Sequence, residues 1–227
     1  MRLEGKVALV SGTAQGHGRA AALRFAAEGA LVVAGDPIHQ DALDTQRLIA
    51  RAGGTALAPA PLDVTDEGSV RSWVDEAVGA FGGIDIVYVT TGSVRFGDLG
   101  SRPYDNVART MGVQLNSVWP TVRATWPHLV RSRGCVLTVC PTTGPTASPL
   151  PPRAARSASR GSLVALTQQL ATEGAPYGVR ANCVSSGRPE DAVSAALFLV
   201  SDEAADITGA NVVVDGAWSC FLPGVTP

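Results

Sequence analysis

The chain has 227 residues, 45% of them hydrophobic and 17% charged, which is enough material for a sizeable buried core. Its net charge of −2 gives no reason to expect nucleic acid or an anionic membrane surface as a partner. There is no signal peptide and no apolar run near the roughly 20 residues that span a bilayer, so we expect a cytoplasmic protein without a membrane segment.

Short apolar runs alternate with amphipathic helical patterns along the chain. Near-continuous apolar character is typical of parallel strands covered on both faces, and it marks candidate strands at 7–10, 31–34, 84–89, 135–139 and 212–214. Apolar residues recur at helical spacing over 70–81, and Pro189-Glu190-Asp191 is typical of a helix start. The alternation predicts an α/β fold: a Rossmann-type doubly wound parallel sheet in three αβα layers, as a single domain over residues 1–227.

A glycine-rich turn follows the first candidate strand. It runs from Ser11 to Gly18, and a helix-compatible segment begins at Arg19. Glycines here allow a tight turn, close backbone approach to a pyrophosphate and close packing of helix on strand, and the amides at the helix start face the phosphates. The strand-turn-helix context makes this a candidate dinucleotide site, whose residues are Gly12, Gln15, Gly16, His17 and Gly18.

The second candidate strand ends in Gly35-Asp36-Pro37. A carboxylate about 20 residues beyond the glycine turn is placed to accept hydrogen bonds from the ribose hydroxyls of adenosine. It also repels a 2′-phosphate, and no Arg or Lys follows directly to offset it. Asp36 therefore favours NAD(H) over NADP(H); the alternative is a solvated aspartate at a strand end.

Residues 141–152 interrupt the alternation. They hold five prolines and show neither a helical nor a strand period, which predicts a loop. The loop follows a candidate strand at its carboxyl end, where α/β sheets place their binding crevice.

The four cysteines, Cys135, Cys140, Cys183 and Cys220, lack CxxC spacing. Three of them lie in or beside apolar runs. We therefore expect core thiols rather than disulfides or metal ligands.

Several motifs in the right order resemble the short-chain dehydrogenase/reductase family over about residues 6–218. Ser11-Gly12-x-x-x-Gly16-x-Gly18 is similar to the family's TGxxxGxG turn. The other matching segments are Leu62-Asp63-Val64, similar to the end of the family's third strand, residues 177–182, residues 188–191, and residues 207–209 with 214–216. The resemblance implies the family's fold, its dinucleotide cofactor, and dimers or tetramers built through its fourth and fifth helices and its last strand.

The resemblance also assigns site residues. Asp63 matches a position that contacts the adenine, and Val64 follows it. Thr91 and Gly92 end the segment that stands where the family carries Asn-Asn-Ala-Gly, of which only the glycine is kept. Asn116 matches the family's asparagine on the fourth helix, which holds a helix kink and a water; a structural remnant is the alternative.

The residues that would carry the proton chemistry are replaced. Arg156-Ser157-Ala158-Ser159-Arg160 stands where the family carries Tyr-Ser-Ala-Ser-Lys. Arginine stays protonated in proteins, so Arg156 and Arg160 cannot act as general acid or base. No other register supplies a Tyr-x-x-x-Lys pair, because Lys6 is the only lysine. A place facing the cofactor pocket and a solvated helix face are equal alternatives for the two arginines.

The serine and the substrate lid of the family also have no clear counterpart. The simplest register places Pro141 at the catalytic serine, and a shift of one residue would offer the hydroxyl of Thr142. In the family a few dozen residues separate the sixth strand from the Arg-Pro-Glu motif, whereas here Gly187 leads directly into Arg188. We therefore expect the cover that closes over substrate and excludes water to be absent.

Three functions stay open. The favoured one is a catalytically inactive NAD(H)-binding subunit, a pseudoenzyme, that supports an active homologous dehydrogenase in a homo- or hetero-oligomer. The second is an active NAD(H)-dependent oxidoreductase whose arginines hold a carboxylated or phosphorylated alcohol or ketone. The third is an NAD(H)-sensing regulatory protein. The sequence names no substrate, and it leaves open whether NAD(H) binding is full, weakened or lost.

Overall fold

The computed structural model describes residues 1–90, 108, 112–141 and 154–216. Its parallel strands form one seven-stranded sheet in the order β3-β2-β1-β4-β5-β6-β7. The strands are β1 (Val7–Ser11), β2 (Leu31–Gly35), β3 (Thr55–Leu57), β4 (Ile86–Thr90), β5 (Cys135–Pro141), β6 (Arg180–Ser186) and β7 (Asn211–Val214). The helices are α1 (Gly16–Ala27), α2 (His39–Arg51), α3 (Glu67–Phe81), α5 (Trp119–Ser132), α6 (Ala154–Gly174) and α7 (Pro189–Val200), with short 3-10 turns η1 (Ala175–Tyr177) and η2 (Asp202–Ala204).

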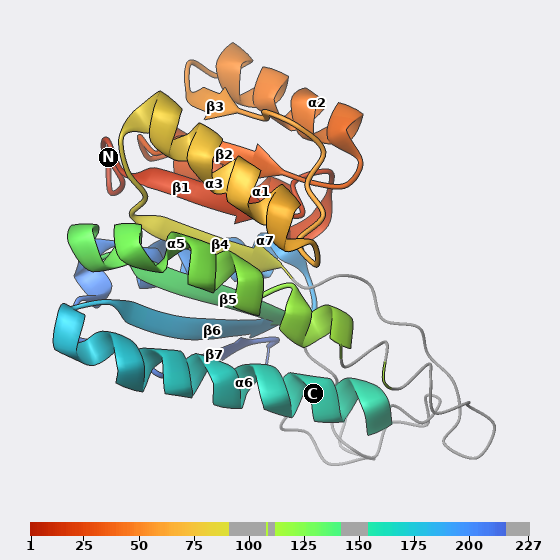
Figure 1. Ribbon diagram of the computed structural model, residues 1–227, viewed down its shortest axis with the longest axis vertical. Helices are drawn as coiled ribbons and strands as arrows, with labels where there is room; N and C mark the ends of the chain where they lie inside the picture. The colour runs from red at the N-terminus through yellow and green to blue at the C-terminus, as the bar shows by residue number, and fades with distance from the viewer. Residues whose placement is uncertain (91–107, 109–111, 142–153, 217–227) are drawn as a thin grey trace.

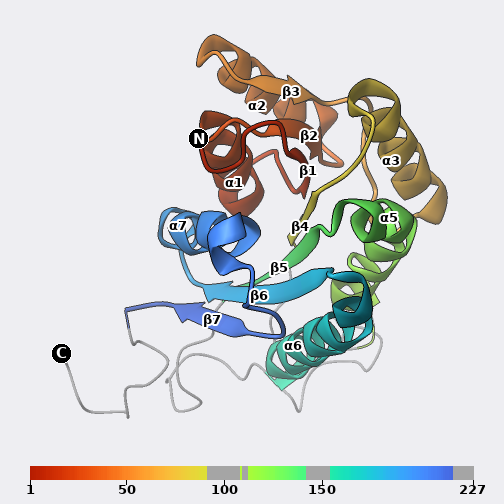
Figure 2. The same ribbon diagram turned by 90° about the vertical axis from the view of Figure 1, so that its left-hand side faces the viewer.

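Helices cover both faces of the sheet (Figures 1 and 2). α1, α2 and α7 pack on one face, and α3, α5 and α6 pack on the other. On the first face, the ring of Phe25 in α1 meets Tyr88 of β4 edge-on, with ring centroids 5.6 Å apart. On the second face, Trp73 of α3 and Leu163 of α6 are buried against the strands. The predicted three-layer, doubly wound arrangement is confirmed.

The third strand differs from the expectation. We expected Leu62-Asp63-Val64 to end it, but β3 stops at Leu57 and residues 58–66 follow as coil and turn. Pro59 and Pro61 lie in between, and proline has no N–H to give to a strand ladder. Leu62 still joins the strand edge through its N–H, which donates to the carbonyl oxygen of Asp36 at 3.0 Å.

The connection from β6 to α7 consists of residues 187 and 188 alone. The predicted absence of a long insertion at this point is therefore confirmed. Because all strands are parallel, the carboxyl ends of β1, β4, β5 and β6 share one edge of the sheet, and α7 starts beside that edge (Figure 1). The strand order reverses between β1 and β4, which places the binding crevice of such a fold at the same edge.

The thiols lie in the core, as expected. Cys135, Cys140 and Cys183 are buried, and Cys220 lies outside the described residues. Within the described part of the chain, no group of three His, Cys, Asp or Glu side chains is arranged to hold a metal ion. None of the helices in that part is long and apolar enough to cross a membrane.

Candidate functional site

The glycine turn between β1 and α1 has no room for a side chain at Gly12 or at Gly18. Gly12 has φ +72°, and a Cβ atom there would lie 2.0 Å from Oγ1 of Thr90. A Cβ atom on Gly18 would lie 2.2 Å from the carbonyl oxygen of Gly12, a contact that no side chain can relieve. Gly16 also has a positive φ, +60°, but open space around it. These glycines are therefore required by backbone shape and by close packing of α1 on β1.

Thr90, at the end of β4, holds the turn from the side. Its N–H donates to Oγ of Ser11 at 3.0 Å, and its Oγ1 donates to the carbonyl oxygen of Ser11 at 3.0 Å. These two bonds join the carboxyl ends of β1 and β4, where the crevice opens. This role of Thr90 was not expected from the sequence, because it depends on a contact with Ser11, 79 positions away.

The start of α1 is arranged to receive an anion. Gln15 is the N-cap residue and makes no capping hydrogen bond with its side chain, and the first turn contains no acidic residue. Gln15 and Gly16 are exposed, whereas His17 is partly buried. The first amides of a helix have no partner within the helix, and the helix dipole makes this end positive. A pyrophosphate fits the chemistry of this end.

Asp36 stands directly after β2 and is only 8% exposed. Its Oδ2 accepts from the N–H of Ala14 at 3.0 Å, and its Oδ1 accepts from the N–H of Ile38 at 2.9 Å. An ionised carboxylate has about four acceptor positions, so hydroxyl donors of a ribose can be added to these two bonds. The structure thus ties Asp36 to the glycine turn, as a residue of the adenosine half of a dinucleotide site should be.

A second network anchors the same turn to α2. The Nε atom of Arg19 donates to Oγ1 of Thr45 at 2.9 Å, and that hydroxyl donates to the carbonyl oxygen of Thr13 at 2.7 Å. The Nη2 atom of Arg19 also donates to the carbonyl oxygen of Asp41 at 3.2 Å. The guanidinium of Arg19 is therefore committed to α2 rather than offered to a phosphate.

The residues predicted for the adenine side lie in a turn before α3. Asp63 is exposed, and its Oδ1 accepts from the N–H of Thr65 at 2.9 Å and from Oγ1 of Thr65 at 2.6 Å. These bonds favour the ionised carboxylate and lower the pKa of Asp63. Val64 is partly buried against the core. Thr91 and Gly92 lie outside the described residues.

The predicted catalytic residues are brought together only in part. Asn116 ends a helical stretch over residues 112–116 and is exposed. Arg156 belongs to α6, but its side chain lies outside the description, and Thr142 lies outside it altogether. Arg160 is 7% exposed and shares a buried face of α6 with Leu163. The alternative of a solvated helix face is therefore wrong for Arg160.

Pro141 is the last residue of β5, in register with Ser186 of β6. Neither described tyrosine can stand in for the missing phenol. Tyr88 is buried in the core, which raises the pKa of its hydroxyl, and Tyr177 is exposed in η1 next to the opposite end of β6. Tyr104 lies outside the described residues. Among the described side chains near the carboxyl ends of β5 and β6, we find no proton donor of the family's type.

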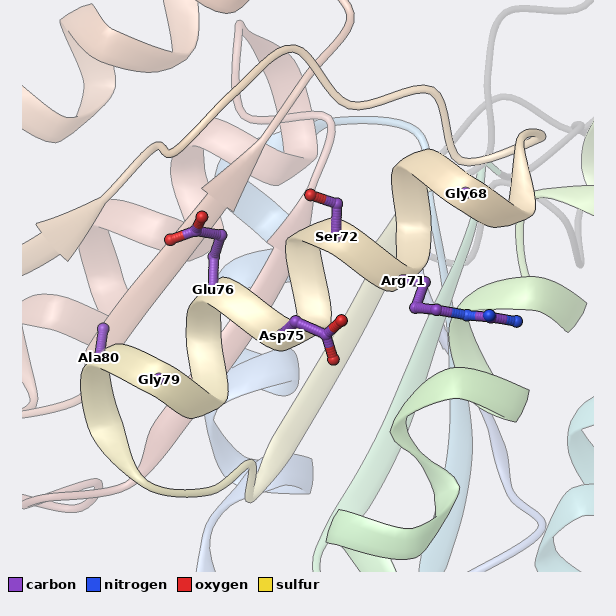
Figure 3. A pocket seen from close by; sticks show the side chains of 7 residues that line it. All are labelled: Gly68, Arg71, Ser72, Asp75, Glu76, Gly79 and Ala80. Atoms are coloured by element: carbon purple, nitrogen blue, oxygen red, sulfur yellow. The ribbon is translucent and has the colours of Figure 1, made fainter.

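A hollow of about 670 Å³ lies along the outer side of α3, outside the predicted site (Figure 3). All of its lining residues come from that one helix, and they are small or charged: Gly68, Arg71, Ser72, Asp75, Glu76, Gly79 and Ala80. It contains none of the residues predicted for the dinucleotide or for catalysis. The glycine turn, Thr90 and Asp36 therefore make the better candidate site, and their cradle, free helix amides and buried carboxylate fit a nicotinamide dinucleotide.

Comparison with known proteins identifies the family. A family model described as "Enoyl-(Acyl carrier protein) reductase" matches residues 12–188. A 2,5-dichloro-2,5-cyclohexadiene-1,4-diol dehydrogenase of Sphingobium indicum is 33% identical over 249 aligned positions, which cover 96% of this chain and 98% of that protein. Because 249 exceeds the 227 residues of this chain, the alignment leaves gaps in it, in keeping with the short β6–α7 connection.

Two further similarities agree. A 3-oxoacyl-[acyl-carrier-protein] reductase of Thermotoga maritima is 30% identical. The alignment covers 95% of this chain and 98% of that protein. The crystal structure of a short-chain type dehydrogenase/reductase from Mycobacterium marinum superposes with a TM-score of 0.90 at 29% identity, covering 96% of this chain and 97% of the other. Proteins of this kind typically bind NAD(P)(H). The chain belongs to the short-chain dehydrogenase/reductase family.

Proposed function

We propose that this chain is an NAD(H)-binding, non-catalytic member of the family that supports an active homologous dehydrogenase as a partner subunit. One observation carries the proposal: by the family resemblance, Arg156 and Arg160 stand where the family carries its tyrosine and lysine, while the glycine turn of the dinucleotide cradle is kept.

The family's chemistry needs a group that exchanges a proton with the substrate oxygen while hydride moves. Such proton transfer contributes about 10²–10⁴ in rate. A guanidinium keeps its proton at any physiological pH, so Arg156 and Arg160 cannot supply it.

The short connection between β6 and α7 supports the same conclusion. A mobile segment at this place would exclude water from the reacting atoms and hold the substrate. Here residues 187 and 188 are all that separates the two elements. Among the described residues, the dinucleotide side of the crevice is kept, and the β6–α7 connection supplies no cover over the substrate side.

The cofactor side supports NAD(H). Asp36 is held beside the glycine turn by the N–H groups of Ala14 and Ile38, and its negative charge would face the 2′ position of the adenosine ribose. Arg19, the cation on the first turns of α1, is bound to Thr45 and Asp41. A 2′-phosphate would therefore meet a carboxylate and no free guanidinium from α1.

A groove between α5 and α6 supports a partner subunit. It has a volume of about 250 Å³ and is lined by Trp119, Val122, Arg123, Trp126, Pro127, Leu170 and Glu173. Trp119 is 57% exposed, which is costly for a large apolar side chain in water. Gly161 on α6 is exposed with open space around it, so another helix could approach closely. α5 lies between β4 and β5, and α6 lies between β5 and β6. By their place between the strands they correspond to the family's fourth and fifth helices, through which the resemblance implies assembly.

The test is to purify the chain alone and after co-expression with an active homologous dehydrogenase. We expect NADH binding by calorimetry, no hydride transfer by the isolated chain with a broad panel of alcohols and ketones, and a complex of fixed stoichiometry by native mass spectrometry. Trp119→Glu should abolish the complex and leave NADH binding unchanged. Tyr177→Glu is the matched control, because Tyr177 is 53% exposed but lies on η1 and does not line the groove. Full activity of the chain alone would overturn the proposal.

The alternative is an active oxidoreductase. The names of the relatives, a diol dehydrogenase and a 3-oxoacyl reductase, favour it, and so does buried Arg160, a cation suited to a carboxylate or phosphate of a substrate. It predicts turnover that collapses in Arg156→Ala and survives in Thr142→Ala. A change of association state on NADH addition, seen by gel filtration without any partner, would instead favour a nucleotide sensor.

A further inference from the structure

His17 introduces a titratable group into the glycine turn. It lies between Gly16 and Gly18, as the second residue of α1, and is partly buried. Its Nε2 atom is buried, and none of the described residues forms a hydrogen bond with it. A buried imidazole nitrogen without a partner is unfavourable, and a ligand that supplies a partner would remove this cost.

The negative charge of Glu190 acts on His17 from a different element. It lies in the first turn of α7, which packs beside α1 on the same face of the sheet (Figure 2). Burial lowers the pKa of His17, and the negative charge of Glu190 partly offsets this by raising it. The two-residue connection after β6 is what starts α7 at this edge of the sheet.

We propose that His17 takes up a proton when the dinucleotide binds, so that its imidazolium lies between the pyrophosphate and the carboxylate of Glu190. The inference rests on the proposed function in one respect, since it requires that the chain binds NAD(H). A protonated imidazole can donate from both ring nitrogens, and it would separate two anions that otherwise repel each other.

The direction of the pH effect follows from the two states of His17. In the free chain its pKa lies below 6.5, so the imidazole is mostly neutral at pH 7. A nearby pyrophosphate favours the charged form and raises the pKa in the complex. Between these two pKa values, the dissociation constant rises with pH by up to about ten-fold per unit, as for one linked proton. Outside this window the affinity does not depend on His17.

The other charged groups around α1 have partners of their own. Arg188 is paired with Asp191 at 2.7 Å, at the start of α7. Asp36, beyond β2, accepts from two backbone N–H groups. Arg19, on α1 itself, donates to α2. Glu190 is therefore the charge to vary together with His17.

The experiment measures NADH binding to the full chain by calorimetry between pH 5.5 and 8.5, in pairs of buffers with different ionisation enthalpies. We expect uptake of up to one proton per NADH near neutral pH and weaker binding as pH rises. His17→Gln should abolish both the uptake and the pH dependence. Glu190→Gln should shift the window to lower pH, because it removes the charge that raises the pKa of His17.

The chain offers matched controls, since its other histidines are His39 and His128. His39→Gln and His128→Gln should each leave the proton uptake in place. NADH binding without proton uptake, or uptake that survives His17→Gln, would overturn this inference and leave the proposed function standing. Absence of NADH binding at every pH would overturn both.

Discussion

The two halves of the sheet, β3-β2-β1-β4 and β5-β6-β7, differ in the residues that stand at the carboxyl ends of their strands. In the first half, β1, β2 and β4 bring together a glycine turn, Thr90 and Asp36, all joined by hydrogen bonds. In the second half, β5 and β6 end in Pro141 and Ser186, and buried Arg160 lies on α6, which connects the two strands. Buried residues of both halves form the core, and among the described residues the cradle expected of the family lies in the first half. Binding and catalysis are therefore separable within one fold.

The physical reason is that the two functions depend on different kinds of residue. The cradle uses backbone shape, so its glycines are tied to the packing of α1 on β1. The catalytic side uses side chains beyond the strand ends, where a substitution such as lysine to arginine changes proton chemistry without creating a cavity. A sheet can thus stay intact while its catalyst changes.

The largest expected effect on the first half of the sheet is that of a substitution at Gly18. Gly18→Ala places a Cβ atom 2.2 Å from a backbone oxygen, and such overpacking costs about 1–3 kcal/mol of stability. We expect NADH affinity to fall by about ten-fold or more, since each 1.4 kcal/mol is a factor of ten. The measurements are thermal unfolding and calorimetry.

Gly161→Ala is the matched control in the second half. Gly161 lies inside α6 with nothing within 4 Å of its Cβ position, so alanine should stabilise the helix by about 0.5–1 kcal/mol. If both variants lost NADH binding alike, the cradle would not be the binding site.

Asp36→Asn should have the next largest effect on binding. It removes a charged acceptor of ribose hydroxyls and can place an amide N–H against the N–H of Ala14. Hydrogen bonds to charged groups contribute about 1.5–3 kcal/mol, so we expect roughly 10–100-fold weaker NADH binding. The ratio of NADH to NADPH affinity should fall as well. Asp63→Asn, at an exposed carboxylate, is the comparison and should change the affinity less.

Alkaline pH should lower the free energy of unfolding through a buried thiol in the second half of the sheet. Burial raises the pKa of the Cys135 thiol from 9.0 to about 11. Because the folded pKa is the higher one, this contribution to stability is complete below pH 9 and is lost as pH rises toward 11, at up to about 1.4 kcal/mol per pH unit. Urea unfolding at pH 8, 9 and 10 should show the slope, and Cys135→Ala should reduce it. An unchanged slope in that variant would assign the effect to Cys183, whose pKa burial also raises.

The smallest effect concerns a buried hydroxyl pair between β5 and α6. Oγ1 of Thr138 lies 2.9 Å from Oγ1 of Thr167, which also donates to the carbonyl oxygen of Leu163. Thr138→Val should cost about 1 kcal/mol, and the double variant with Thr167→Val should cost less than the sum of the single changes. NADH binding should be unchanged in all three variants. A loss of binding would show that the two halves are coupled.

Some elements were missed in the sequence for identifiable reasons. α5 contains Pro127, and proline argues against a helix interior, yet Thr121, Val122, Thr125 and Leu129 form a buried face that holds the helix in place. β3 was expected to extend to Val64 because the motif resembled a strand end, but Pro59 and Pro61 stop the ladder earlier.

The sequence alone determined that strands and helices alternate, where the glycine turn lies and that arginines which cannot exchange protons are present at 156 and 160. Apolar periodicity and residue chemistry are local properties, so they can be read along the chain. Only the tertiary structure decided that Thr90 holds Ser11, 79 positions away, that Arg160 is buried, and that the negative charge of Glu190 acts on His17. These contacts depend on which strands become neighbours, and the topology of the sheet decides that.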